Sequence, residues 1–256
     1  MKNTAEHSFP TELEKAKGLE VARMVESIFK QVPLEVAAHL VDSNVVLTLA
    51  GLKGQTEFFI DIPNAADDVK IKAAMNGVGQ KLNAFNSDIY ADTEGRIFNA
   101  ASDQRRTWPV SIYNLQALEG ATANTKLKGI PIFKKSSGMN GLKQWAENAY
   151  GNFDSDDLDS EIVVGVIKGY PDQAIVDFID YLKTNRKKKV VDSKIPYTGF
   201  YSEAQPNYDF YPEHINDPGI AKNIAQSGEI LKAFYESPWH KQVASKLSFK
   251  KTPRYE

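Results

Sequence analysis

The chain has 256 residues, of which 42% are hydrophobic and 25% charged, so it can bury a large apolar core without disulfide or metal staples. Because cysteine is absent, disulfide frameworks, thiolate zinc sites, iron–sulfur clusters and cysteine nucleophiles are excluded. The net charge of −2, with no strongly basic half, argues against a nucleic-acid partner, because phosphate binding needs a basic surface.

The N-terminal segment MKNTAEHSFPTELEKAKGLE lacks the apolar run of a signal peptide. No later segment approaches the roughly 18 apolar residues of a membrane span. We therefore expect a soluble, cytoplasmic protein without a membrane partner. Export by a route that needs no cleavable signal is the alternative.

The first predicted element is a helix from Thr11, where Thr11 and Glu14 fit a capping box. Its apolar positions form one helical stripe: Val21, Met24, Val25, Ile28 and Val32. The segment LEVAAHLVD fits a helix or a strand. The next segments, VVLTLA from Val45 and TEFFIDI from Thr56, are β-rich and flank the turn-prone GLKGQ, so they predict a hairpin.

From Asn64 the apolar spacing predicts a second long helix, with its stripe at Ile71, Ala74, Met75, Val78, Leu82 and Phe85. Gly77 and Gly79 lie inside this pattern and not after a strand, so they do not form a dinucleotide-binding loop. The segment SDIYADTEGRIFNA then predicts two short strands joined at residues 93–95, and LKGIPIFKK predicts a further strand at a sheet edge.

After Gly138 the apolar positions have helical spacing in five segments: 139–150, 158–168, 172–185, 219–236 and 238–247. Two helix starts are marked by a capping residue before a proline, at Asp217 and at Ser237. Gly169 and Pro171 predict a tight corner between two helices, which we interpret as a purely structural turn. A functional role for Tyr170 or Asp172 at this corner is the alternative.

These elements predict an α+β fold. Its N-terminal part has a small, mostly antiparallel sheet and helices, and its C-terminal part is mainly helical with a long aromatic loop. We divide the chain into an α+β subregion, residues 1–152, and a helical subregion, residues 153–256. Since no long spacer separates them, one compact domain is the alternative.

Known site motifs are absent from the sequence. The acidic run from Asp154 to Glu161 fails as an EF-hand, because Leu158, Asp159 and Gly165 stand where a polar ligand, a glycine and a glutamate are needed. We interpret it as acids at a helix start and predict no metal site. The basic run at residues 186–189 is typical of a helix end, with an anion patch as the alternative. No motif names a cofactor.

An anion site is predicted beside Trp108. Arg105 and Arg106 precede this tryptophan, just before an expected helix start, and two guanidinium groups beside an aromatic ring can hold a carboxylate or phosphate. In the structural alternative, these arginines pair with acids of the protein itself.

The aromatic loop is the segment PYTGFYSEAQPNYDFYPEH, residues 196–214. Its three prolines exclude a continuous helix, and long irregular loops often form lids or binding segments. The candidate ligand-binding residues are Tyr197, Tyr201, Tyr208, Phe210 and Tyr211. In the alternative, the loop folds onto the helical half and buries its rings.

Glu213 and His214 are the candidate catalytic residues, because a carboxylate beside an imidazole can act as acid and base near neutral pH. The leading hypothesis is nevertheless a protein that acts by binding a partner protein or a small polar ligand through residues 196–214. An enzyme, a hydrolase or transferase on a small polar substrate, is the alternative. Homo-oligomerisation through the loop is a third hypothesis.

Overall fold

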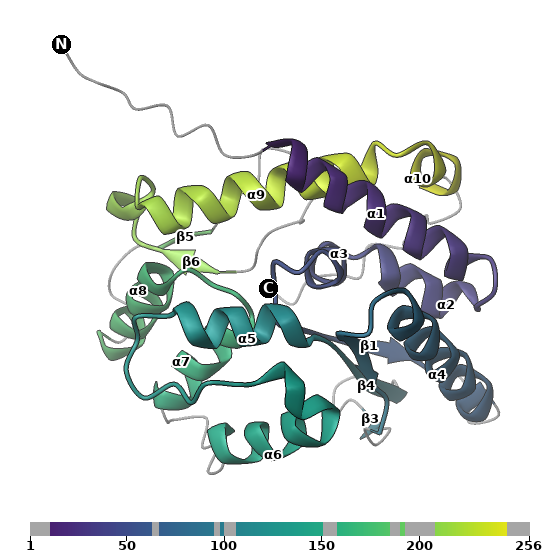
Figure 1. Cartoon of the computed structure of the whole chain (residues 1–256), viewed down its shortest axis with the longest axis horizontal. Helices are drawn as coiled ribbons and strands as arrows, with labels where there is room; N and C mark the ends of the chain where they lie inside the picture. Colours follow the sequence, from purple (N-terminus) through teal and green to yellow (C-terminus); the bar gives the residue numbers. More distant parts are fainter. Residues whose placement is uncertain are drawn as a thin grey trace.

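The computed structural model describes residues 11–62, 67–94, 98–99, 106–150, 158–184, 190–192 and 208–244. The fold is α+β: many helices surround one small antiparallel sheet (Figure 1), as the sequence predicts. No helix within these ranges is both long and apolar enough to cross a membrane.

The sheet has a central strand that bonds to three others. Its strands are β1 (Gln55–Asp61), β2 (Ile89–Asp92), β3 (Phe98–Asn99) and β4 (Arg106–Asn114). Strand β4 pairs antiparallel with β1 on one side and with β2 and β3 on the other. A separate two-stranded ribbon joins β5 (Val191–Asp192) to β6 (Asp209–Phe210).

The helices of the first half are α1 (Thr11–Phe29), α2 (Leu34–Ala37), the short 3₁₀ helix η1 (Ala38–Val41), α3 (Ser43–Leu49), α4 (Asp68–Phe85) and α5 (Leu115–Asn124). Those of the second half are α6 (Gly138–Tyr150), α7 (Leu158–Ile167), α8 (Asp172–Lys183), α9 (Pro218–Tyr235) and α10 (Pro238–Val243). The helices α6 to α10 match the five helical segments that the sequence predicts.

The main core lies between the sheet and the helices α1, α3, α4 and α9. On the face of the sheet toward these helices, Trp108, Val110 and Ile112 of β4 alternate with outward residues and are completely buried. The helices α1 and α9, from opposite ends of the described chain, lie side by side above this core (Figure 1). They approach closely at Gly18, where an added Cβ would lie 2.3 Å from the carbonyl oxygen of Ile230.

A second core forms against the opposite face of the sheet. Phe133, Leu142 and Trp145 are buried there between α5, α6 and α7. Tyr90 of β2 and Tyr113 of β4 pack against this cluster, and they are paired across the two strands. The sheet therefore separates two apolar clusters, one on each face.

The predicted hairpin is wrong in its first half, because residues 43–49 form the helix α3. Asp42 caps this helix, since its carboxylate accepts a hydrogen bond of 2.8 Å from the amide of Asn44. The helix is buried on most of its surface, from Val45 to Leu49. A segment buried on all sides is apolar throughout, so its β-branched residues do not distinguish a strand from a helix.

The two short strands predicted in residues 87–100 are present as β2 and β3, and both pair with β4. Two other predictions are corrected. The helix start expected after Trp108 is instead part of the strand β4. The predicted edge strand at residues 127–135 contains no strand: residues 127–134 are irregular and Lys135 begins a short 3₁₀ helix. Its Phe133 is nevertheless buried, and the backbone amide of Phe133 donates to the hydroxyl of Thr122. Side-chain bonds thus take the place of strand pairing there.

The predicted starts of α9 and α10 are confirmed. The carboxylate of Asp217 accepts hydrogen bonds from the amides of Gly219 and Ile220, and the hydroxyl of Ser237 accepts one from the amide of His240. Between α7 and α8, Gly169 has a φ of 71°, the left-handed conformation that glycine adopts without strain.

Candidate functional site

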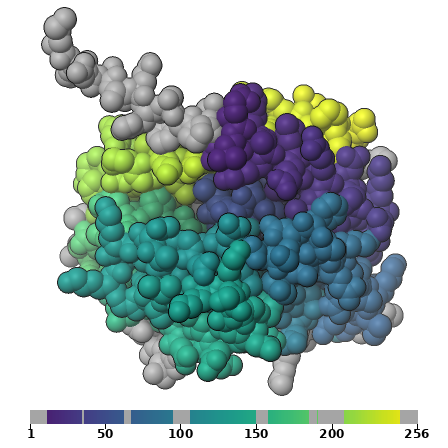
Figure 2. Space-filling model, in the orientation of Figure 1, coloured from purple at the N-terminus to yellow at the C-terminus, as the bar shows by residue number. Residues whose placement is uncertain are grey.

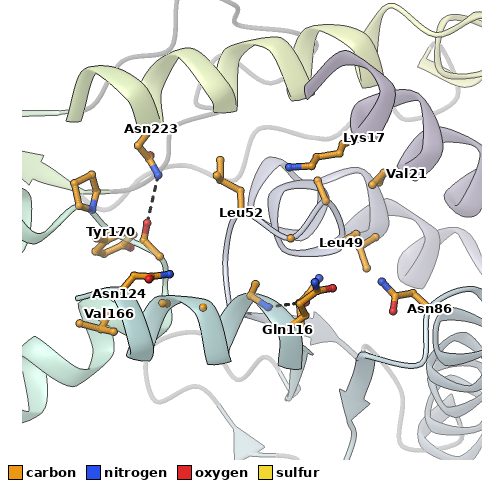
Figure 3. Close-up of a pocket in the computed structure, with 18 of the residues that line it drawn as sticks. Lys17, Val21, Leu49, Leu52, Asn86, Gln116, Asn124, Val166, Tyr170 and Asn223 are labelled. Carbon is orange, nitrogen blue, oxygen red and sulfur yellow. Dashed lines mark hydrogen bonds between the residues drawn. The ribbon is translucent and has the colours of Figure 1, made fainter. Parts of the chain in front are cut away.

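A central cleft of about 690 Å³ separates α1 and α9 from α5, with α3 at its floor (Figure 3). In Figure 2 the purple surface of α1 and the teal surface of the α5 region meet across a narrow band of slate-coloured atoms. We define the central cleft by its polar lining residues, Lys17, Glu20, Asn86, Asn114, Gln116, Asn124, Asp172 and Asn223, and its apolar ones, Val21, Met24, Leu49, Leu52, Val166 and Tyr170.

The walls of the central cleft carry polar groups that are available to a ligand. Gln116 and Asn124 of α5 are exposed and have no side-chain partner within the described ranges. Across the cleft, α1 contributes Lys17 and Glu20, so that charges of both signs lie on one wall. The Lys17 ammonium is 3.7 Å from the carboxylate of Glu14, a long contact that leaves it able to bind elsewhere.

Asn114 connects α3, the floor of the cleft, to α5, one of its walls. Its side-chain oxygen accepts a hydrogen bond from the amide of Ala117 and so caps α5, while its side-chain nitrogen donates to the carbonyl of Thr48 in α3. Asn114 is 3% exposed, so both bonds are shielded from water. The cleft wall is therefore rigidly attached to α3.

The corner between α7 and α8 closes one end of the cleft. Asn223 of α9 donates a hydrogen bond of 3.3 Å to the carbonyl of Gly169 (Figure 3), which ties the two walls together. Asp172 accepts hydrogen bonds from the hydroxyl of Thr125 and the amide of Lys126. The corner that the sequence marks as a candidate thus lies at the cleft, with Tyr170 on its wall.

A second hollow of about 370 Å³, the aromatic cavity, lies on the other side of Tyr170. We define it by its lining residues, Glu161, Val164, Gly165, Lys168, Tyr170, Ala174, Ile175, Phe178, Tyr208 and Asp209. The rings of Tyr170 and Tyr208 are 5.3 Å apart, and that of Tyr208 is 6.2 Å from Phe210. Tyr170 is therefore a wall shared by the central cleft and the aromatic cavity.

The pKa values of several ionisable groups around Tyr170 are strongly shifted. Burial raises the pKa of Tyr170, and the negative charge of Asp209 raises it further. Burial, with a further contribution from Tyr170, likewise raises the pKa of Tyr208. Burial lowers the pKa of Lys53 to about 7, and the charge of Lys168 adds to this shift. The ammonium of Lys53 bonds to the side-chain oxygen of Asn44 and lies 5.3 Å from the centre of the Tyr170 ring.

The candidate ligand-binding tyrosines of the aromatic loop fall into two groups. Tyr197 and Tyr201 lie outside the described residues. Tyr208, Phe210 and Tyr211 are 5%, 1% and 4% exposed and pack against α8 and α9, so their rings face inward. Tyr208 still lines the aromatic cavity, and its hydroxyl donates to the side-chain oxygen of Asn223.

The partner of His214 is a residue that the sequence gives no reason to single out. The Nδ1 atom of His214 is 2.8 Å from a carboxylate oxygen of Asp177, whereas Glu213 is exposed. Asp177 is 2% exposed and also accepts hydrogen bonds from the amide of Tyr211 and the side chain of Gln173. The bond to Asp177 raises the pKa of His214. His214 lines neither the central cleft nor the aromatic cavity.

Of the predicted anion site, Arg106 begins the strand β4, whereas Asn114, which lines the cleft, ends this strand. Arg105 is outside the described residues. The guanidinium of Arg106 is 2.6 Å from the carboxylate of Asp68 in α4, which is the structural alternative stated for it. Trp108 is completely buried, with the ammonium of Lys72 5.4 Å from its ring centre. The structure therefore does not bring Arg106 and Trp108 to the central cleft.

The acidic run lies partly outside the described residues, and its described part forms the first turn of α7, with Asp159 and Glu161. Within the described ranges, no three histidine or acidic side chains are placed to hold a metal ion. The basic run at residues 186–189 is also outside them.

Sequence reasoning missed the carboxamide side chains of the cleft. Asn86 ends α4, Gln116 and Asn124 are on α5 and Asn223 is on α9, so they are distant along the chain and share no motif. Only the corner around Tyr170 gave a local signal.

The chain matches no family model, and no curated protein or solved structure is significantly similar to it.

Proposed function

We propose that the protein binds a small polar ligand in the central cleft. The supporting observation is the combination of a volume of about 690 Å³ with the polar side chains of Gln116 and Asn124 (unpaired within the described ranges), opposite the charges of Lys17 and Glu20. Ligand sites typically have such volumes and place a few polar groups around an apolar floor. Carboxamides both donate and accept hydrogen bonds, so they suit hydroxyl, amide and carboxylate groups.

In this proposal the aromatic loop supports the ligand site. Tyr208 bonds to Asn223 and packs on Tyr170, and both of these partners line the cleft. The proposal favours a small ligand over a partner protein, because a docking surface needs exposed rings, whereas Tyr208, Phe210 and Tyr211 are buried.

A steric block of the cleft tests this proposal. Gly120 lines the cleft within α5, and a Cβ added there meets no atom within 4 Å. Gly120→Leu should therefore fill the cleft while it preserves or raises stability, since leucine favours helices more than glycine does. Wild type and variant are compared by calorimetric titration with amino acids, sugars, nucleotides and dicarboxylates.

The matched control is Gly77→Leu in α4, where an added Cβ also meets nothing within 4 Å and which does not line the cleft. A ligand that binds wild type and Gly77→Leu but not Gly120→Leu supports the proposal. Equal binding to all three proteins would place the ligand outside the central cleft and overturn it.

A second candidate function is a hydrolase or transferase that uses Glu213 and His214. The observation that favours it is the bond between His214 and the buried Asp177, since such a carboxylate orients an imidazole for proton transfer. Activity toward simple esters and phosphates that is lost in His214→Gln and Glu213→Gln would support it. Activity unchanged by both substitutions would reject it.

A further inference from the structure

We propose that the aromatic cavity is a second binding site, which accepts a compact aromatic ring that carries a carboxylate. This site is distinct from the central cleft, and it is enclosed by α7, α8 and the strand β6 of the aromatic loop. The two sites share one wall, the ring of Tyr170.

The shape and lining of the cavity favour a planar ring. Tyr170, Phe178 and Tyr208 present three aromatic side chains to a volume of about 370 Å³. Aromatic rings prefer offset or edge-on contacts with centroids roughly 4.5–7 Å apart, and the pair of Tyr170 and Tyr208 already has this geometry at 5.3 Å. A ligand ring of similar size can extend this cluster.

The charge of the cavity wall favours an anion on that ring. Lys168 lines the cavity and has no ion-pair or side-chain hydrogen-bond partner within the described ranges. The buried Lys53 lies close enough for the two ammonium groups to repel each other, which contributes to the low pKa of Lys53. A carboxylate at Lys168 would remove part of this repulsion and gain a charge-assisted hydrogen bond.

Two acidic residues also line the cavity, and neither forms an ion pair with Lys168 within the described ranges. Glu161 is two helical turns earlier in α7, about 10 Å along the axis. Asp209 is already engaged by other residues and raises the pKa of Tyr170. The tyrosine hydroxyl consequently stays protonated and can donate to the same anion.

The test compares three probes that share one ring and differ in charge: benzoate, benzyl alcohol and benzylamine. Binding to the full chain is measured by calorimetry and by ligand-observed NMR. We expect benzoate to bind most tightly, and Lys168→Gln to weaken it about tenfold without changing the affinity for benzyl alcohol. The matched control, Lys232→Gln, changes an exposed lysine of α9 that does not line the cavity and should have no effect.

A second variant tests the location independently of charge. Val164→Phe adds a ring to the cavity wall and should abolish binding of benzoate and benzyl alcohol alike. The proposal would be overturned if none of the three probes bound wild type, or if benzylamine bound more tightly than benzoate. It would also be overturned if Lys168→Gln or Val164→Phe bound benzoate as tightly as wild type does. Thermal unfolding of each variant shows that it is folded.

The test of the aromatic cavity can fail or succeed independently of the test of the central cleft. Gly120→Leu blocks the central cleft from the opposite side of Tyr170, so benzoate binding should persist in that variant. Loss of benzoate binding in Gly120→Leu together with full binding in Val164→Phe would place the probe in the central cleft and overturn the aromatic cavity as its site.

Discussion

Asp177 is a buried carboxylate that holds the end of the aromatic loop on α8. It accepts hydrogen bonds from the amide of Tyr211 and the side chains of His214 and Gln173. We predict that Asp177→Asn lowers the free energy of unfolding by about 1.5–3 kcal/mol, because a hydrogen bond to a charged group in a buried site is lost or weakened. Urea unfolding followed by circular dichroism measures the change.

Glu213→Gln is the control for this prediction. Glu213 is exposed, lies in the same segment and makes no side-chain hydrogen bond or ion pair within the described ranges, so the change should stay within about 0.5 kcal/mol. If Asp177→Asn were as stable as Glu213→Gln, the three bonds to Asp177 would contribute nothing to holding the loop.

The same pair of residues predicts a pH dependence. The hydrogen bond to Asp177 raises the pKa of His214 in the folded protein above the unfolded value of about 6.5. The stabilisation is therefore fully present below about pH 6.5 and is lost as the pH rises through the folded pKa. The difference in unfolding free energy between wild type and His214→Gln should shrink with rising pH. A difference that grows, or an NMR titration of His214 below about pH 6.5, would contradict this.

For single residues, the sequence could indicate which positions were unusual but not which residues they contact. His214 and Tyr208 stand out because histidines are few and aromatic residues crowd this segment. Their contacts, Asp177 and Asn223, lie 37 and 15 residues away along the chain. Such contacts follow from the packing of β6 and α9 on α8, and the local sequence carries no record of them.

The corner between α7 and α8 depends on the backbone of Gly169. Its φ is 71°, and an added Cβ would lie 2.5 Å from the carbonyl oxygen of Leu52. We predict that Gly169→Ala lowers the unfolding free energy by more than about 1 kcal/mol, because it adds both backbone strain and a steric clash. Thermal unfolding measures it, and ligands of the central cleft should also bind more weakly since this corner forms its end.

Gly77→Ala in α4 is the matched control. Gly77 is inside a regular helix and has open space at its Cβ, so alanine should stabilise the protein by roughly 0.5–1 kcal/mol. Opposite signs for the two substitutions are expected. Equal effects would mean that the left-handed turn at Gly169 is not required for the fold.

Helices were more predictable than strands because their signals are local. The Asp217 and Ser237 caps and the stripe of Met75, Val78 and Leu82 were all readable from spacing along the chain. Strand β1 pairs with β4 and not with the preceding segment 45–50, so the hairpin expected between those two segments was wrong. For α3, every residue from Val45 to Leu49 is buried, so the sequence shows no alternation of exposed and buried positions that would reveal helical spacing.

On the scale of the whole molecule, the main core crosses the division at residue 152. It contains residues of α1 and α4 from the first subregion and residues of α9 and α10 from the second. The close approach of α1 and α9 at Gly18 depends on the absence of a side chain. The two subregions therefore stabilise each other through one shared apolar cluster.

This arrangement predicts one cooperative unfolding transition. Trp108 lies in the first subregion and Trp239 in the second, and both belong to the main core. In variants that retain one of these tryptophans, with phenylalanine at the other two tryptophan positions, fluorescence and circular dichroism should give the same urea midpoint for each variant. Adding Gly18→Ala should lower the urea midpoints of both variants, and their free energies of unfolding by about 1–3 kcal/mol, because the added methyl group separates α1 from α9. Fluorescence and circular-dichroism midpoints that differ within one variant, or a loss seen by Trp239 alone, would establish two independent domains, because a shared core cannot unfold in halves.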